Sequence, residues 1–162
     1  MSETKVAAVN QHKSLARGMI AGLIAGLAAT AAKTLAERIF PPHTHGELEP
    51  QELAVECVAA DTLTPVAKAR LSEGLRWGLG ASAGAAYGAV AEFYPEATAK
   101  HGVSFGLVLE ALSHEAALPA LGLAAEPENE TQTALERSSE ITSYVVYGLT
   151  AELVRRLVRR CL

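Results

Sequence analysis

Polar side chains spaced one helical turn apart stand in an otherwise apolar stretch of this chain. Glu110 and His114 are four residues apart, so a helix would place both on one face, with Glu115 beside them. If that helix crosses a membrane, Glu110 lies near its middle, where a charge costs on the order of 3 kcal/mol. A carboxylate and an imidazole in that setting can pass a proton or hold a cation. Glu140 and Tyr144, in the last apolar stretch, are candidate neighbours on another helix.

The same residues also have a structural interpretation, in which Glu110 is a clamp that joins two helices through a Tyr or Ser hydroxyl. A polar group buried between helices needs such a partner whether or not it takes part in chemistry. A metal site is a further alternative, because Glu110, His114 and Glu115 offer two or three ligands. Di-metal helical bundles, however, use Glu-x-x-His spacing and repeat it on other helices, and this chain has no second copy.

A second pair of candidate metal ligands is His43-x-His45, in a segment rich in turn residues. Two imidazoles at this spacing can hold a zinc or copper ion at a protein surface. In a Pro-rich turn, a pair of solvated side chains is the simpler interpretation. The sequence therefore predicts no resident metal and no other cofactor.

Motifs typical of enzymes are missing from the chain. No Ser-His-Asp arrangement suggests itself, and Gly78-x-Gly80-x-x-x-Gly84 departs from the dinucleotide-binding fingerprint and follows no predicted strand. Basic residues gather at the two ends of the chain rather than in a continuous surface, which argues against nucleic-acid binding. We therefore expect neither an enzyme nor a nucleic-acid partner.

Four apolar stretches must position these side chains, and they alternate with acidic connectors that contain proline. The 162 residues are rich in Ala, Gly and Leu and only 5% are aromatic, which favours helices packed through small residues over a β-barrel. We predict an all-α, integral membrane four-helix bundle over residues 13–162, after a flexible tail at 1–12. The expected spans are about 15–40, 71–93, 98–121 and 133–158, with a short amphipathic connector helix at 52–60.

Glycine recurs every fourth residue in the predicted helices, which gives each of them a face without side chains. Such a face lets another helix approach closely and is typical of membrane helices. In a helix exposed to water, each Gly would cost roughly 1 kcal/mol relative to Ala. We therefore predict helix packing, within the chain or with a partner, through Gly18, Gly22, Gly26, Gly80, Gly84, Gly88, Gly102 and Gly106.

The distribution of basic residues indicates an orientation. They precede the first span and end the chain, as Lys5, Lys13, Arg17, Arg155, Arg156, Arg159 and Arg160. By the positive-inside rule, both termini are then cytoplasmic. The first apolar stretch also resembles a signal peptide, with Ala-Thr-Ala at 29–31 as the cleavage site. Because the apolar helix continues to Phe40, we favour an uncleaved span.

Four segments of the chain, taken in order, carry a resemblance to a known family. They are ARGMIAGLIAGLAATAAKT, the turn FPPHT, the stretch FGLVLEALSHEAALPALGL and the closing VVYGLTAELVRR. This series resembles the YagU-like family of bacterial inner-membrane proteins of unknown function. Members of that family often carry a His before the Tyr-Gly of the last helix, where this chain has Tyr144. The resemblance implies a four-span protein of a bacterial inner membrane and no particular reaction.

Two functions follow as expectations. The first is a structural or accessory subunit, or an oligomeric scaffold, that packs in the bilayer with its own copies or within a larger membrane protein complex. The alternative is a subunit of a proton- or cation-coupled transporter or channel, which would use Glu110 and His114.

Overall fold

Helices dominate the residues that the computed structural model describes, which are 13–41, 50–59, 63–113 and 134–162. The elements in chain order are α2 (Leu15–Ile39), α3 (Pro50–Ala59), α4 (Pro65–Phe93), the 3-10 helix η1 (Pro95–Gly102), α5 (Val103–Leu112) and α7 (Ala134–Cys161). These residues contain no strand, so the all-α prediction is confirmed for them. The predicted connector helix is present as α3.

Local sequence explains where the first long helices begin and end. The Ser14 side chain accepts a hydrogen bond from the Arg17 N–H at the start of α2, and Thr64 caps α4 in the same way. α4 begins at Pro65, six residues before the predicted start of the second span, because a capping Thr followed by Pro is a complete helix start. Pro41 and Pro95 follow the ends of α2 and α4, since a prolyl ring cannot continue a helix.

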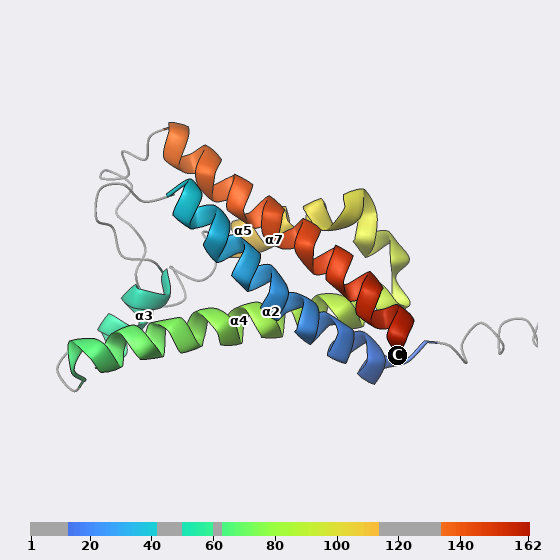
Figure 1. The fold of residues 1–162 in the computed structure, drawn as a ribbon, viewed down its shortest axis with the longest axis horizontal. Helices are drawn as coiled ribbons and strands as arrows, with labels where there is room; N and C mark the ends of the chain where they lie inside the picture. Colours follow the sequence, from blue (N-terminus) through green and yellow to red (C-terminus); the bar gives the residue numbers. More distant parts are fainter. Residues whose placement is uncertain (1–12, 42–49, 60–62, 114–133) are drawn as a thin grey trace, which may run out of the picture.

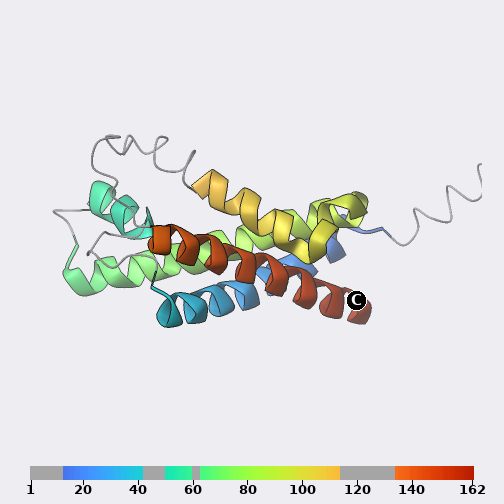
Figure 2. The same cartoon turned by 90° about the horizontal axis from the view of Figure 1, so that it is seen from above.

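Three long helices, α2, α4 and α7, form the body of the molecule, and α2 packs against both of the others. The start of α2 and the ends of α4 and α7 meet at one end of the bundle, so α2 runs antiparallel to both neighbours (Figure 1). We call this end, defined by Ser14, Glu92 and Arg159, the basic end. α5 lies along α7, and α3 lies against the first half of α4 (Figure 2).

Glycines bring two pairs of helices into backbone contact. A methyl group added at Gly22 would lie 2.8 Å from the Gly88 Cα, and one at Gly84 would lie 2.5 Å from the Gly26 Cα. α5 and α7 meet similarly, because a methyl group at Gly106 would lie 2.9 Å from the carbonyl carbon of Tyr144. All eight glycines singled out from the sequence lie at such contacts, and Gly148 joins the second of them.

The helix expected from residue 98 starts later. Residues 95–102 instead form η1, and the backbone has positive φ at Lys100, His101 and Gly102, reaching 87° at Gly102. Glycine adopts that conformation without strain. A side chain at Gly102 would also meet the Cβ of Glu152 at 2.8 Å. α5 therefore begins at Val103 and extends to Leu112, and residues 114–121 of the predicted span lie outside the described residues.

The distribution of polarity is the reverse of that in most water-soluble bundles. Among the described residues, the largest fully buried side chains are those of Tyr147, Glu152 and Ser143, whereas Ile20 is 50% exposed and Leu153 61% exposed. The interior of α2 holds only alanines, glycines and a threonine. Among the described helices, α2 alone is long and apolar enough to cross a membrane, a property that signal sequences and buried core helices share. The four predicted spans are thus not established by composition.

Candidate functional site

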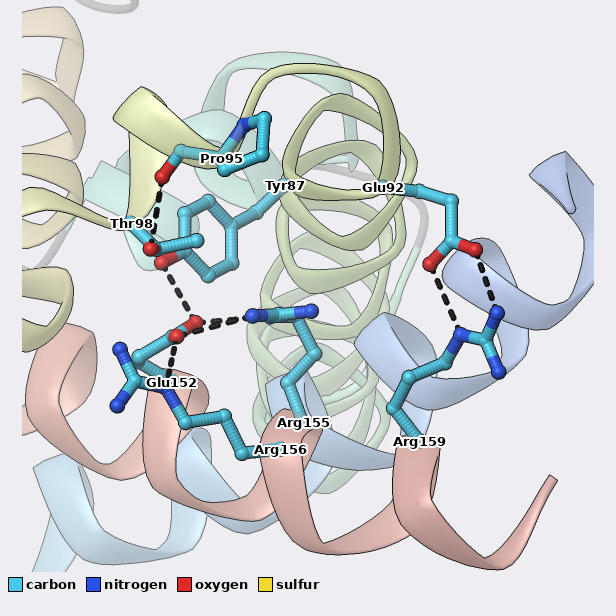
Figure 3. Close-up of polar contacts among 8 residues, drawn as sticks. All are labelled: Tyr87, Glu92, Pro95, Thr98, Glu152, Arg155, Arg156 and Arg159. Atoms are coloured by element: carbon cyan, nitrogen blue, oxygen red, sulfur yellow. Dashed lines mark hydrogen bonds and ion pairs between the residues drawn. The ribbon is translucent and has the colours of Figure 1, made fainter. Parts of the chain in front are cut away.

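Glu152 is the centre of a buried polar cluster near the basic end. Its side chain is 1% exposed and accepts hydrogen bonds from three partners on two helices. The Tyr87 hydroxyl donates to Glu152 Oε2 at 2.8 Å, and Arg155 donates from Nε and Nη2 at 2.8 and 2.9 Å. Arg156 donates to the other carboxylate oxygen. Figure 3 shows Tyr87 reaching down from α4 onto the three side chains of α7.

The spacing on α7 explains why this carboxylate can hold two guanidinium groups. Arg155 and Arg156 follow Glu152 by three and four residues, so both lie one turn further along the same side of the helix. Arg155 is itself buried and lies 5.9 Å from the centre of the Tyr87 ring. A buried guanidinium needs such neutralisation, because removing one partner of a buried ion pair leaves a costly uncompensated charge.

Aromatic rings support the cluster from the side of α5. The Tyr87 ring stacks on Phe105 with their centroids 4.2 Å apart, and Phe105 also contacts Tyr147. The Tyr147 hydroxyl donates to the Gly80 carbonyl oxygen at 2.6 Å, where the helix surface of α4 carries no side chain. α4, α5 and α7 are therefore joined through three rings, and the hydroxyl groups of the two tyrosines each have a hydrogen-bond partner.

A second ion pair closes the basic end. Arg159 donates to both oxygens of Glu92 at 2.9 and 2.6 Å, and the Ser14 N–H donates to the same carboxylate at 2.9 Å. Glu92 thus joins the ends of α4 and α7 to the start of α2. Figure 3 shows its pairing with Arg159. The carboxylate raises the pKa of the Arg159 guanidinium further, so this group stays charged.

The opposite end of the bundle holds a separate set of charges. Lys33 forms an ion pair with Glu37, as the i,i+4 spacing implies, and its ammonium group lies 4.3 Å from the centre of the Tyr144 ring. Arg76 of α4 approaches Glu37 at 3.6 Å. These contacts join α2, α4 and α7 at a point well separated along the helices from Glu152.

The structure describes three of the five residues of the predicted polar site, which are Glu110, Glu140 and Tyr144. Glu110 is buried on α5, and its Oε1 lies 3.5 Å from Nη2 of Arg137 on α7, with no hydrogen bond to that oxygen from the described residues. Glu140 is buried one turn further along α7, and Tyr144 follows by another turn. His114, Glu115, His43 and His45 lie outside the described residues. Within those residues, no three His, Cys, Asp or Glu side chains gather as metal ligands.

Glu152 was not among the predicted site residues, although the residues that follow it indicate an ion pair. A glutamate followed at three and four residues by arginines is a helical ion-pair motif, and here it interrupts an apolar segment. Tyr87 had no comparable signal, because it stands 65 residues away on another helix.

These features define a class of protein: an all-helical bundle packed through small residues, with ion pairs inside and apolar side chains outside. A family described as "Protein of unknown function (DUF1440)" matches residues 27–153, and the chain belongs to this family. The expected membership of an uncharacterised family is thereby confirmed. No curated protein matches the chain, and no solved structure matches it.

Proposed function

We propose that this protein is an integral membrane protein of the bacterial inner membrane and acts as a structural or accessory subunit. The observation that carries this proposal is the inverted polarity of the bundle. Exposed leucines and isoleucines cover the outside of α2, while Glu152 and Arg155 are buried against α4. In a bilayer the outer face meets acyl chains and the inner charges satisfy one another.

The close glycine contacts favour the same environment. Six glycines of α2 and α4 leave the two helix backbones in contact, with no large side chain buried between them. In water such an interface buries little apolar surface to offset the low helix propensity of glycine. In lipid the helices are already formed, and close packing with small residues is the usual way for them to associate.

A structural role is favoured because the central charges are fully engaged. Glu152 accepts bonds from Tyr87, Arg155 and Arg156, which leaves it poorly suited to release and rebind an ion. The glycine faces of α2 and α4 also cover each other, so a partner would dock on the outer apolar faces. Leu107, Val108 and Leu112 of α5 form one such exposed surface.

Membrane insertion is testable with single cysteines. The two native cysteines are exposed and unbonded, and both are first changed to serine. We expect Ile24→Cys to resist a membrane-impermeant maleimide in proteoliposomes and to react after denaturation. Arg160→Cys, at the exposed end of α7, is the matched control and should react in vesicles that display this end. Rapid labelling of Ile24→Cys in intact vesicles would refute insertion.

The subunit role is testable by native mass spectrometry of protein released directly from membranes. We expect discrete assemblies heavier than the 17.0 kDa chain, either homo-oligomers or a complex with a fixed composition. Detection of the single chain alone, in membranes that retain other known complexes intact, would contradict a subunit or scaffold role.

Glu110 supports a second candidate function, a subunit of a proton- or cation-coupled transporter or channel. Its buried Oε1 receives no hydrogen bond from the described residues and faces Arg137 at 3.5 Å. This function predicts proton-coupled flux in liposomes that Glu110→Gln abolishes and Glu73→Gln, at an exposed carboxylate, leaves unchanged. Wild-type liposomes without flux would eliminate it.

A further inference from the structure

Two arginines at the basic end are exposed and have no carboxylate partner among the described residues. They are Arg17, in the first turn of α2, and Arg160, in the last turn of α7. Arg156 also points outward with 42% of its side chain exposed, although its Nε is bonded to Glu152. We call Arg17, Arg156 and Arg160 the basic rim. Two acidic groups at this end are already engaged, Glu92 by Arg159 and Glu152 by Arg155 and by the Nε of Arg156.

The basic rim continues exposed apolar faces rather than a polar surface. Helical spacing places Arg156 and Arg160 on the same side of α7 as its exposed leucines, which are Leu149, Leu153 and Leu157. Arg17 likewise shares a side of α2 with Ile20 and Ile24, which follow it by three and seven residues. On both helices, a row of exposed apolar side chains that acyl chains could contact ends in one or more guanidinium groups.

From this arrangement we propose that the basic rim binds anionic phospholipid, with the phosphate at the arginines and the acyl chains along the leucine and isoleucine stripes. Guanidinium groups suit phosphate oxygens because their donors match the geometry of the anion. A soluble anion or a nucleic acid would use the charge but not the adjoining apolar stripes. The inference rests on the proposed membrane insertion and adds a lipid class and a site to it.

The test uses Cys161, which is exposed beside Arg160, as the position of a fluorescent label after Cys57→Ser. Labelled protein is reconstituted into vesicles of phosphatidylcholine with a small fraction of spin-labelled phosphatidylglycerol or spin-labelled phosphatidylcholine. Quenching of the label gives the local preference for anionic over zwitterionic lipid. We expect a clear preference for phosphatidylglycerol that excess inorganic phosphate does not remove.

The variant Arg17→Gln/Arg160→Gln should lose this preference, by about fivefold for each arginine at low ionic strength. The matched control is Arg38→Gln/Arg70→Gln, which removes the same charge from exposed positions away from the basic end and should keep the preference. Equal losses in both variants, or no loss in the first, would overturn the proposal. Full competition by inorganic phosphate would assign the rim to soluble anions instead.

Failure of insertion gives a different result. A protein that remains outside the vesicles shows no quenching by either lipid, which refutes the proposed function and this inference together. Quenching by both lipids without preference leaves insertion intact and refutes the lipid site alone.

Discussion

Tyr87 of α4 and Glu152 of α7 are joined by a 2.8 Å hydrogen bond across the interior of the bundle, 65 positions apart in the chain. The tyrosine is 5% exposed and the glutamate 1%, so neither group has ready access to water. The bond links α4 to α7, and it completes the set of partners around a buried carboxylate.

Removal of the Tyr87 hydroxyl should lower the stability of the bundle without creating a cavity in its core. We expect Tyr87→Phe to lower the free energy of unfolding by about 1.5 to 3 kcal/mol, the usual value for a hydrogen bond to a charged group. The measurement is unfolding in mixed micelles with increasing SDS. Tyr94→Phe, at a largely exposed ring in the same part of the molecule, is the control and should change stability by less than about 0.5 kcal/mol. Equal effects of the two changes would show that the bond contributes nothing specific.

Gly84 and Gly74, on the same helix, should respond in opposite ways to alanine. A methyl group at Gly84 would lie 2.5 Å from the Gly26 Cα, so Gly84→Ala must push α2 and α4 apart, at a cost of about 1 to 3 kcal/mol. Gly74 has nothing within 4 Å of the added methyl group, so Gly74→Ala should be neutral or stabilise α4 by up to about 1 kcal/mol. The same SDS titration compares them, and a stable Gly84→Ala protein would contradict the observed helix contact.

Reversal of the Glu92–Arg159 pair should separate the effect of charge from that of geometry. Glu92→Arg alone places two cations together and should cost about 1 to 3 kcal/mol, as should Arg159→Glu alone. The double exchange should recover only part of the loss, because an arginine at 92 cannot accept the bond from the Ser14 N–H. Unfolding of the four proteins forms a double-mutant cycle with the coupling energy as its readout.

The Glu73–Arg76 pair is the control for that cycle. Its atoms are 3.9 Å apart and its glutamate is largely exposed, so Glu73→Gln should cost less than about 0.5 kcal/mol. A coupling energy near zero for Glu92 and Arg159 would show that this pair contributes no more to stability than an exposed ion pair does.

Much of the secondary structure was predictable because its causes are local. Pro41 and Pro95 mark helix ends, and the connector helix was expected at 52–60 and lies at Pro50–Ala59. The start of α4 was placed too late because the apolar pattern begins after the capping residues. The α-helix was expected from residue 98, but residues 95–102 form a 3-10 segment that ends in positive φ at Lys100, His101 and Gly102, which no simple sequence pattern predicts.

The candidate site was less predictable. The i,i+4 pair of Lys33 and Glu37 was visible from spacing, and Glu110 was identified as a polar residue in an apolar helix. Its contact with Arg137 was not, since ion pairs between helices depend on how the helices are rotated and shifted. For the same reason, the spacing of Glu152 and the two arginines after it indicates an ion-pair motif but not the hydrogen bond from Tyr87.

Local pattern thus fixed the helical class, the approximate helix ends and the faces where glycines recur, because propensity and periodicity act within a few turns of one helix. It left open whether those glycines would meet a partner or one another. Only the tertiary structure shows that Gly18, Gly22 and Gly26 lie against Gly80, Gly84 and Gly88. It also shows that the Tyr87 hydroxyl bonds to Glu152. Those pairings depend on the register and crossing of whole helices, which no short stretch of sequence contains.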